Sequence, residues 1–389
     1  MRPGESLLMA LSVCLLTRNE EGNIARVIRS VSGVASEVIV ADTGSSDRTV
    51  QVANDHGAKI CHVAWQDDFA AARDYALSQA TTDWILWLNP DEELLPISQQ
   101  SVHECLTRDD AFGYYVLVHE LVKADQPDTF SETTQLRLFR RRPHLHSRGR
   151  LHPSFVPSLD EVAEQEGRQI YLSEIRLQRH AYLSQLTEPK LRWAARLLEL
   201  ELRDRPRQLH YLIEYGRTLL LLKDPKAHPV LAEAVEQILP IRSAPSAPLP
   251  EVQRLLEYVL TVSAEQSRSR LTQEEARDLA LRWFPYSPAM LWRIAEYYFQ
   301  RGDFRRAAEF LERLDQCRKT GVYDRSESFD PAILSDLVAL NLGVCYTRIA
   351  DLDKAERCFI SLLDSKSFHD RAAQNLALVQ SLRTQGNKP

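Results

Sequence analysis

The sequence predicts an α/β N-terminal domain with a mostly parallel sheet, followed by an all-α domain of helical repeats. In the first part of the chain, short apolar runs alternate with helical patterns, as in parallel sheets with crossover helices. Eight of the 13 glycines precede residue 170, which indicates a turn-rich first half and a helical second half. From about Glu188 onward, long helical patterns with few turn residues follow one another. We therefore place the domains at residues 1–180 and 185–389.

The composition excludes several classes of protein. A chain of 389 residues with 44% hydrophobic and 26% charged residues is typical of a globular protein. The formal charge of −6 gives no reason to expect nucleic acid as a partner. No stretch reaches the roughly 20 apolar residues of a membrane span, and the apolar residues 6–16 lack a cleavage site for a signal peptide. Six scattered cysteines without a C-x-x-C pair indicate a reduced compartment, so we expect a soluble cytoplasmic protein.

Each element of the predicted sheet follows from a local pattern. The run LSVCLL is typical of a strand buried on both faces. Ile24, Val27 and Val31 then form one stripe at helical spacing. The expected order is a strand at 11–16, a helix at 19–32, a strand at 37–42, a helical stretch ending at Gly57, a strand at 58–63, a helix at 69–80 and a strand at 84–88.

Polar residues follow three of the predicted strands. Ligands of parallel sheets bind at the carboxyl ends of the strands, so these residues predict a binding site. A purely structural role is also open, because Asp, Asn, Ser and Thr commonly form turns and helix caps. Neither G-x-G-x-x-G after the first strand nor G-x-x-x-x-G-K-[ST] occurs, which argues against a dinucleotide dehydrogenase and a P-loop NTPase. The polar residues concerned are Thr17, Asn19, Asp42, Thr43, Ser45, Asn89, Asp91 and Glu92.

Three ordered blocks resemble the nucleotide-sugar-binding half of family 2 glycosyltransferases, which have the Rossmann-like GT-A fold. The blocks are SVCLLTRNEEGNIARVIRSV, EVIVADTGSSDRT and WQDDFAAARDYALSQATTDWILWLNPDEEL. The resemblance covers residues 12–95, continues more weakly to about residue 156, and is closest to the bacterial branch with tetratricopeptide repeats. It implies that Asp42 holds the uracil or ribose and that Arg73 binds the pyrophosphate. The residues implied to bind the nucleotide sugar are Thr17, Asn19, Glu20, Asp42, Ser45, Arg73 and Asn89.

The resemblance also implies a divalent metal site after the last of these strands. The family usually has D-A-D-E where this chain has Asn89, Pro90, Asp91 and Glu92. In the family the second aspartate, here Asp91, binds Mn²⁺ or Mg²⁺, which neutralises charge on the leaving nucleoside diphosphate. With asparagine in the first position, we expect the metal to bind more weakly.

The catalytic base is not assigned by the resemblance. The stretch QLRLFRRRPHLHSRGRLHPSF resembles the family's R-L-F-R-N … G-R-I-H-E segment, so His152 is an expected metal or phosphate ligand. Pro153 stands where the family has a glutamate that could act as general base. Glu120 and Glu132 remain as candidates by elimination. Three alternatives stay open for the arginines and histidines from Arg137 to His152. They form a solvated face, they close over the pyrophosphate, or His144, His146 and His152 bind a metal.

The second half of the chain contains tetratricopeptide-like repeats. In LNLGVCYTRIADLDKAERCFISLL, large, small and aromatic residues occupy the repeat positions, namely Leu342, Gly343, Tyr346, Ala355 and Phe359. An earlier copy begins at Ile294, and about 14 extra residues fall within 318–331. Such arrays usually bind a peptide or a partner protein on their concave face.

These patterns lead to one main hypothesis of function. We expect an inverting glycosyltransferase that uses a nucleotide diphosphate sugar, with the helical repeats recognising either a peptide or protein acceptor or a partner protein. The alternative is a catalytically degenerate protein that only binds a nucleotide sugar, or a repeat scaffold, because Asn89 and Pro153 replace expected carboxylates. A nucleotidyltransferase is disfavoured, since no glycine-rich loop with a basic residue follows the first strand.

Overall fold

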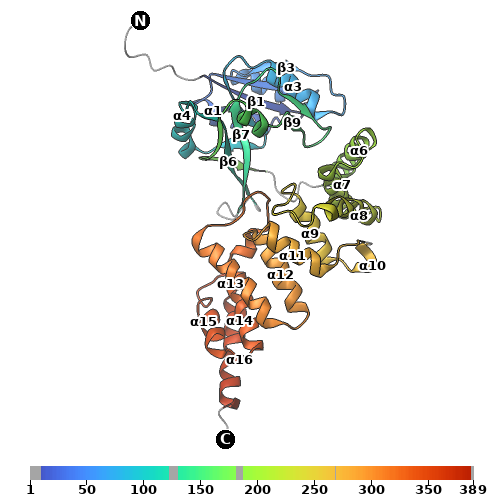
Figure 1. Cartoon of the computed structure of the whole chain (residues 1–389). Coiled ribbons are helices and arrows are strands. Elements are labelled where there is room, and N and C mark those ends of the chain that lie inside the picture. The colour runs from blue at the N-terminus through green and yellow to red at the C-terminus, as the bar shows by residue number, and fades with distance from the viewer. Residues whose placement is uncertain (1–9, 122–129, 181–186, 268, 387–389) are drawn as a thin grey trace. The chain divides into compact units, whose positions relative to one another are not determined.

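The chain folds into two compact units. The division falls between Pro206 and Arg207. The first unit contains a large sheet with helices, and the second is built of helices, so the predicted fold class is confirmed (Figure 1). The computed structural model describes residues 10–121, 130–180, 187–267 and 269–386.

The first unit is organised by an eight-stranded sheet with the order β3-β2-β1-β4-β7-β6-β10-β5. Strands β3, β2, β1 and β4 are parallel, while β7 runs antiparallel to both β4 and β6. Strand β10 is parallel to β6, and β5 is antiparallel to β10. The small hairpin of β8 and β9 is separate. The strands are β1 (Leu11–Thr17), β2 (Glu37–Asp42), β3 (Lys59–His62), β4 (Trp84–Leu88), β5 (Glu92–Leu94), β6 (Ala111–Leu121), β7 (Phe130–Arg140), β8 (His146–Arg148), β9 (Ser154–Val156) and β10 (Gln169–Arg179).

The predicted strands agree with the structure to within one residue at each end, but the first predicted helix begins later than expected. It starts at Ile24 rather than at Asn19. Asn19 has a left-handed backbone with φ of 56°, and its backbone N–H donates to Ser45 Oγ at 2.9 Å. These contacts to the loop after β2 hold residues 19–23 in a turn, which a local helical pattern does not reveal.

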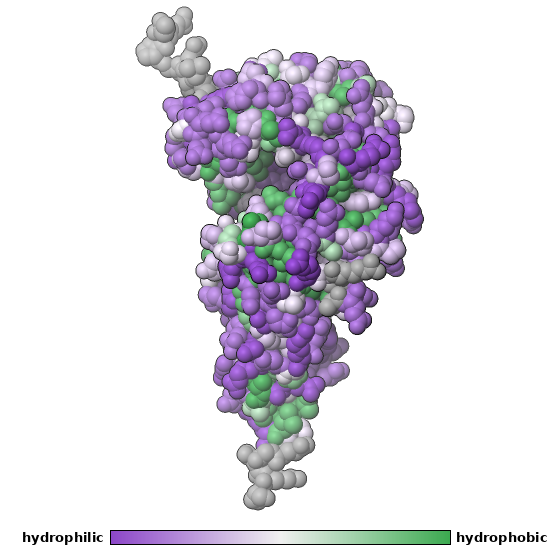
Figure 2. Space-filling view, turned by 45° about the vertical axis from the view of Figure 1, so that its right-hand side comes forward, coloured by the Kyte–Doolittle hydropathy of each residue, from purple (hydrophilic) through white to green (hydrophobic). Residues whose placement is uncertain are grey.

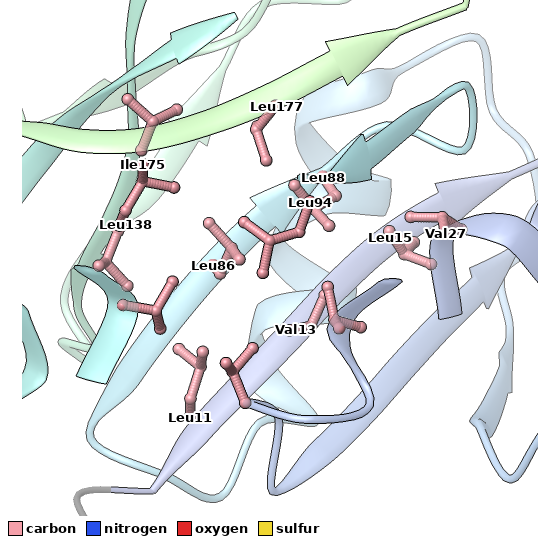
Figure 3. Close-up of a cluster of buried hydrophobic side chains, with 14 of the residues drawn as sticks. Leu11, Val13, Leu15, Val27, Leu86, Leu88, Leu94, Leu138, Ile175 and Leu177 are labelled. Atoms are coloured by element: carbon pink, nitrogen blue, oxygen red, sulfur yellow. The ribbon is translucent and has the colours of Figure 1, made fainter. Parts of the chain in front are cut away.

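Helices cover both faces of this sheet. One core packs α1 and α4 against the sheet, and Figure 3 shows Leu11, Val13 and Leu15 of β1 converging with side chains of β4, β5, β7 and β10. The other core packs α3 and α5 against the opposite face around Ile85, Trp87 and other buried residues. The helices of this unit are α1 (Ile24–Val31), α2 (Thr49–Asp55), α3 (Phe69–Ser78), the short η1 (Pro96–Ser98), α4 (Gln99–Leu106), α5 (Leu159–Gln165) and α6 (Glu188–Asp204).

Helix α6 belongs to the first unit, whereas the predicted boundary at 180–185 lies before it. Trp193 of α6 lies 6.3 Å from Trp65 between ring centroids. Arg196 of the same helix donates to Asp67 Oδ2 at 2.6 Å. The helical pattern of α6 was correctly recognised, but its apolar and charged partners lie about 130 residues earlier in the chain. The tertiary contacts therefore attach this helix to the sheet domain.

The second unit consists mainly of helix pairs. Gly343 of α14 packs so closely on α15 that a Cβ atom there would lie 2.5 Å from Phe359. Gly216 of α7 has the same relationship to Leu231 of α8. The predicted small and aromatic repeat positions therefore meet at helix–helix contacts. The helices are α7 (Leu209–Leu221), α8 (Ala227–Ile238), η3 (Leu239–Ile241), α9 (Val252–Thr261), α10 (Ala264–Ser267), α11 (Gln273–Trp283), α12 (Pro288–Gln300), α13 (Phe304–Thr320), η4 (Pro331–Leu334), α14 (Asp336–Arg348), α15 (Leu352–Ile360) and α16 (His369–Gly386).

The side seen in Figure 2 is mostly hydrophilic, with hydrophobic residues in small separate patches. None of the described helices combines the length and the apolar composition of a membrane span.

Candidate functional site

The carboxyl ends of the parallel strands meet at one edge of the sheet. Thr17 of β1 is in register with Asp42 of β2, and Asp42 is in register with His62 of β3. On the other side of β1, Leu15 pairs with Leu88, the last residue of β4. The structure thus places Thr17 and Asp42 side by side at this edge. The turn that contains Asn89 and Asp91 begins next to them.

Asp42 organises the turn that follows its strand. Its side chain is buried, with 3% of its surface exposed. The carboxylate accepts the backbone N–H of Gly44 at 3.0 Å and that of Ser45 at 3.1 Å, and it also accepts the hydroxyl of Ser45. The local turn-forming role of Asp42 and Ser45 is therefore present in the structure, and contact with a nucleotide remains a prediction.

Thr17 presents a buried polar atom at the same edge. Its carbonyl accepts the backbone N–H and the hydroxyl of Thr43, each at 3.0 Å. Its own hydroxyl oxygen is buried and has no hydrogen-bond partner among the described residues. An unsatisfied buried hydroxyl costs roughly 1–3 kcal/mol, so a polar ligand atom at this point would be favourable.

Arg73 is held between two aromatic rings. Its guanidinium lies 4.0 Å from the ring centroid of Phe155 and 4.9 Å from that of Trp87. Nη1 donates to the carbonyl of Pro153 at 3.1 Å, and Nε is buried without a hydrogen-bond partner in the described part of the chain. Burial lowers the pKa of Arg73 to about 9. Arg73 is thus not a solvated helix residue. A bound anion would offset the free-energy cost of burying its charge.

The motif around Arg73 has a structural role as well. Asp68 caps helix α3, since its carboxylate accepts the backbone N–H of Ala70 at 2.8 Å and of Ala71 at 3.1 Å. Trp65 packs edge-to-face on Phe69 with 4.8 Å between ring centroids. These contacts fix the start of the helix that carries Arg73.

Glu92 anchors the turn after β4 instead of facing a ligand. It is wholly buried, and its Oε1 accepts hydrogen bonds from Arg137 Nη2 and Arg179 Nε, each at 3.1 Å. Asn89 donates its backbone N–H to Oε2 at 2.8 Å and its side-chain Nδ2 to Oε1 at 3.0 Å. Burial by itself would raise the pKa of Glu92, but the two arginines outweigh this effect and lower it. Glu92 and Asn89 therefore hydrogen-bond to each other within the protein.

Asp91 remains as the acidic side chain of this turn that is available to a ligand. It is half-buried, and burial raises the pKa of its carboxyl, against the opposing charge of Arg179. Glu20 lies close enough for the two carboxyls to repel each other, and its pKa is also raised, mainly by burial. Two carboxyls held near each other in this way favour binding of a cation or a proton.

The segment from Arg137 to His152 is largely tied to the protein. Arg140 and Arg141 donate to backbone carbonyls, Arg142 pairs with Glu166, and Arg150 donates to Asp204 at 2.7 Å. The segment is therefore neither a simple solvated face nor a free basic lid. The sequence left these alternatives open because the partners of the arginines lie far away in the chain.

The assignment of Asp91 and His152 as metal ligands stays a prediction. His152 is exposed, with a left-handed backbone at φ of 50°. Within the described residues, no group of three or more His, Cys, Asp or Glu side chains is arranged to hold a metal ion. This finding gives no support to the alternative of His144, His146 and His152 around one metal. A metal bound here would have to take most of its ligands from a phosphate group and water, with Asp91 and His152 as the predicted protein ligands.

The two candidate bases lie on the hairpin of β6 and β7. Glu120 is in register with Arg179 of β10, whose charge interacts with it. Glu132 faces His119, with 2.8 Å between Oε2 and Nε2. Sequence reasoning did not include Arg179 or His119 in the site. Their partners are 87 and 13 residues away, so a local motif could not identify them.

In doubly wound α/β domains, ligands bind at the carboxyl ends of the parallel strands, which is where these polar side chains lie. Residues 12–154 match the family model described as glycosyl transferase family 2. The resemblance is therefore confirmed, and the first unit contains a family 2 glycosyltransferase domain.

Two curated relatives are similar to part of the chain. A TPR repeat-containing protein of Synechococcus elongatus is 38% identical over 156 residues, covering 40% of this chain and 38% of that protein. An uncharacterized glycosyltransferase of Rickettsia typhi is 33% identical over 119 residues, covering 30% of this chain and 40% of the relative. The chain thus spans well under half of the length of these relatives.

Part of this chain is similar to the solved structure of glucosyl-3-phosphoglycerate synthase from Mycobacterium tuberculosis in complex with Mn²⁺, UDP-glucose and phosphoglyceric acid. It is 24% identical, with a TM-score of 0.26, and the match covers 33% of this chain and 52% of that one. A likeness at this level carries no information about the substrate of the present protein.

Proposed function

We propose that this protein is a glycosyltransferase that takes a sugar from a nucleotide diphosphate sugar and transfers it with inversion. The observation that supports this most is the position of Asp91 in a family 2 domain, half-buried beside the strand ends that carry Thr17 and Asp42. The unsatisfied hydroxyl of Thr17 and the buried Nε of Arg73 supply polar atoms that a nucleotide and a diphosphate would satisfy.

The residues assigned to the donor keep the roles that the resemblance implies. Asp42 and Thr17, with Asn19, Glu20 and Ser45 from the adjoining loops, would hold the nucleoside. Arg73 would stabilise the diphosphate, and Asn89 would shape the turn near the sugar. Guanidinium groups suit phosphate because they offer planar, charge-assisted hydrogen bonds.

A divalent metal fits this site only with few protein ligands. Glu92 and Asn89 are bonded to each other, so Asp91 is the ligand that remains in the motif, and His152 would be the second. Mg²⁺ and Mn²⁺ accept such sites when substrate phosphates and water complete the coordination. When bound, the metal would neutralise charge on the leaving diphosphate.

The helical unit would select the acceptor. Helical repeat arrays commonly bind extended peptides, so a peptide or protein is the acceptor class that we propose. We also keep the proposal of a cytoplasmic protein, because all six cysteines lie in the described part of the chain and are free thiols.

The proposal is tested with the full-length chain and a panel of nucleotide diphosphate sugars, with and without Mn²⁺. We expect one donor to raise the melting temperature and to release nucleoside diphosphate, since selective binding stabilises the folded state. Asp91→Ala should abolish this release. Asp109→Ala is the matched control, because Asp109 is exposed and precedes β6 at the opposite edge of the sheet. If Asp91→Ala retains wild-type turnover, the proposed catalytic site is wrong.

A second candidate function is supported by Asn89 and Pro153, which replace two expected carboxylates. A degenerate protein would bind a nucleotide sugar or a partner without transfer. In the same assay, a donor that raises the melting temperature but yields no nucleoside diphosphate with any acceptor or metal tested would favour this alternative.

A further inference from the structure

The hairpin of β6 and β7 extends beyond the carboxyl end of β4. Strand β7 pairs with β4 only from Arg140 to Leu138, whereas β6 and β7 remain paired as far as Leu121 and Phe130 (Figure 1). Strand β6 has the same direction as β4, because both are antiparallel to β7. The tip half of the hairpin therefore stands at the edge of the sheet that carries Asp91.

Four polar residues form a row across this end of the sheet. Glu132 is in register with His119, His119 with Gln178, and Gln178 with Glu93. Residues in register on neighbouring strands point to the same face, and strands lie about 4.8 Å apart. His119 is thus about 10 Å from Glu93, measured across two strand spacings, and Glu93 follows Asp91 by two positions.

The neighbouring row points the other way. Glu120, Arg179 and Glu92 are in register, and each lies two positions from Val118, Leu177 or Leu94 on the same face, which carries the core shown in Figure 3. Glu120 therefore lies on the side of the buried Glu92, where its carboxylate interacts with the charge of Arg179. Of the candidate groups on the hairpin, the pair of His119 and Glu132 occupies the opposite face.

The imidazole of His119 is held in one orientation. Its Nε2 lies 2.8 Å from Glu132 Oε2, and its ring stacks on Phe130 with 4.1 Å between centroids and 13° between planes. Gln178 Nε2 donates to the backbone carbonyl of His119 at 2.9 Å. Only 8% of the residue is exposed. A carboxylate that accepts the Nε2–H of histidine leaves Nδ1 as the basic nitrogen, which has no hydrogen bond among the described residues.

We propose that His119, oriented by Glu132, is the general base that removes the proton of the acceptor. This inference rests on the proposed transferase function. The acceptor oxygen forms a bond to the anomeric carbon, and the bond from that carbon to the diphosphate oxygen breaks. The electron pair of the broken bond leaves with the nucleoside diphosphate, and the acceptor proton passes to Nδ1 of His119. Glu132 is a positioning residue that stabilises the imidazolium.

The strand order supports this division of the site. Thr17 and Asp42, the proposed nucleoside contacts, lie on β1 and β2, on one side of β4. His119 and Glu132 lie on β6 and β7, on the other side of β4. An acceptor that approaches from the β6 side would reach the sugar opposite the nucleotide, as inversion requires.

The experiment uses the full-length chain and the nucleotide sugar that raises the melting temperature of the wild type, with water as the acceptor. We expect His119→Ala to lower kcat for release of nucleoside diphosphate by 10²- to 10⁴-fold, the usual contribution of a general base. The melting-temperature shift caused by the donor should stay unchanged. Glu132→Gln should lower kcat less and move the acidic limb of the pH profile. His103→Ala, on helix α4, is the matched control.

The outcomes separate this inference from the proposed function. If kcat of His119→Ala is within twofold of the wild-type value and the pH profile is unchanged, His119 is not the base. If His119→Ala does not fold, His119→Gln, which keeps an amide next to Glu132, gives the same decision. If no nucleotide sugar stabilises the wild type or is cleaved by it, the proposed function itself is wrong and this inference fails with it.

Discussion

Arg137 Nη2 lies 3.1 Å from Glu92 Oε1 in the interior of the first unit. Arg179 reaches the same oxygen from another strand, so one carboxylate balances two guanidinium groups. Neither arginine would remain favourable in this position without the carboxylate, because an uncompensated buried charge is costly. This ion pair and the hydrogen bonds from Asn89 to Glu92 together hold the turn that carries Asp91.

The first prediction concerns this buried carboxylate. Glu92→Gln should lower the free energy of unfolding by about 3–5 kcal/mol, since it leaves two buried arginines with one neutral partner. Urea denaturation measures the change. Glu166→Gln is the control, because Glu166 pairs with Arg142 near the surface and should cost no more than about 1 kcal/mol. If both variants lose the same free energy of unfolding, burial does not increase the contribution of the ion pair to stability.

The second prediction concerns the unsatisfied hydroxyl of Thr17. Thr17→Val keeps the shape of the side chain and removes the buried oxygen, so the ligand-free protein should gain up to about 1 kcal/mol of stability. The donor-induced rise in melting temperature should become smaller. Thr43→Val is the matched control and should lose about 1 kcal/mol, because the Thr43 hydroxyl donates to the Thr17 carbonyl at 3.0 Å. An unchanged donor shift in Thr17→Val would remove Thr17 from the donor site.

The third prediction tests the contact between two repeat helices. Gly343→Ala places a Cβ atom 2.5 Å from the ring of Phe359, so the second unit should lose roughly 1–3 kcal/mol of stability. Gly22→Ala is the control, since a Cβ atom there meets nothing within 4 Å. The double variant with Phe359→Leu should recover part of the loss. No recovery would mean that the helices cannot use the released space.

The fourth prediction is a pH dependence in the helical unit. Burial raises the pKa of Glu327 from 4.5 to about 7, although its ion pair with Arg254 opposes the shift. The folded state then holds the proton more tightly than the unfolded state, so stability is full below about pH 4.5 and falls as the pH rises through 7. The groups around it are Arg254 of α9, Glu251 directly before α9, and Glu214 and Arg217 of α7.

Glu327→Gln should remove this dependence. The variant should match the wild type at pH 5 and exceed its stability by roughly 2 kcal/mol at pH 8, at about 1.4 kcal/mol per pKa unit. Thermal unfolding at the two pH values measures this difference. Glu236→Gln, which alters an exposed pair with Arg270, should change neither value by more than about 0.5 kcal/mol. A variant less stable than the wild type at pH 8 would show that the ion pair outweighs burial.

Local sequence was a good guide wherever the structure is decided by neighbours along the chain. The strands at 11–17, 37–42 and 84–88 follow from apolar runs, and their carboxyl ends meet because parallel strands end at one edge. The repeat positions Gly343 and Phe359 were identified from spacing alone. In each case the pattern and the packing have the same period.

Long-range partners were not predictable in the same way. The motif predicted Glu92 as an acidic residue beside Asp91, but its pairing with Arg137 and Arg179 depends on strands 45 and 87 residues away. The role of the arginine-rich segment stayed open in the sequence because its carbonyl and carboxylate partners are not local. Helix α6 looked like the first repeat helix, yet its tryptophan packs against Trp65.

The sequence by itself determined the two-domain organisation, the order of the early strands, the family of the first domain and the candidate residues at the sheet edge. Only the tertiary structure decided which of these residues have their hydrogen bonds satisfied within the protein and which, such as Thr17 and Arg73, do not. The physical reason is that secondary structure and motif spacing follow from local preferences. Burial, charge compensation and the pairing of His119 with Glu132 depend on which strands become neighbours in the folded sheet.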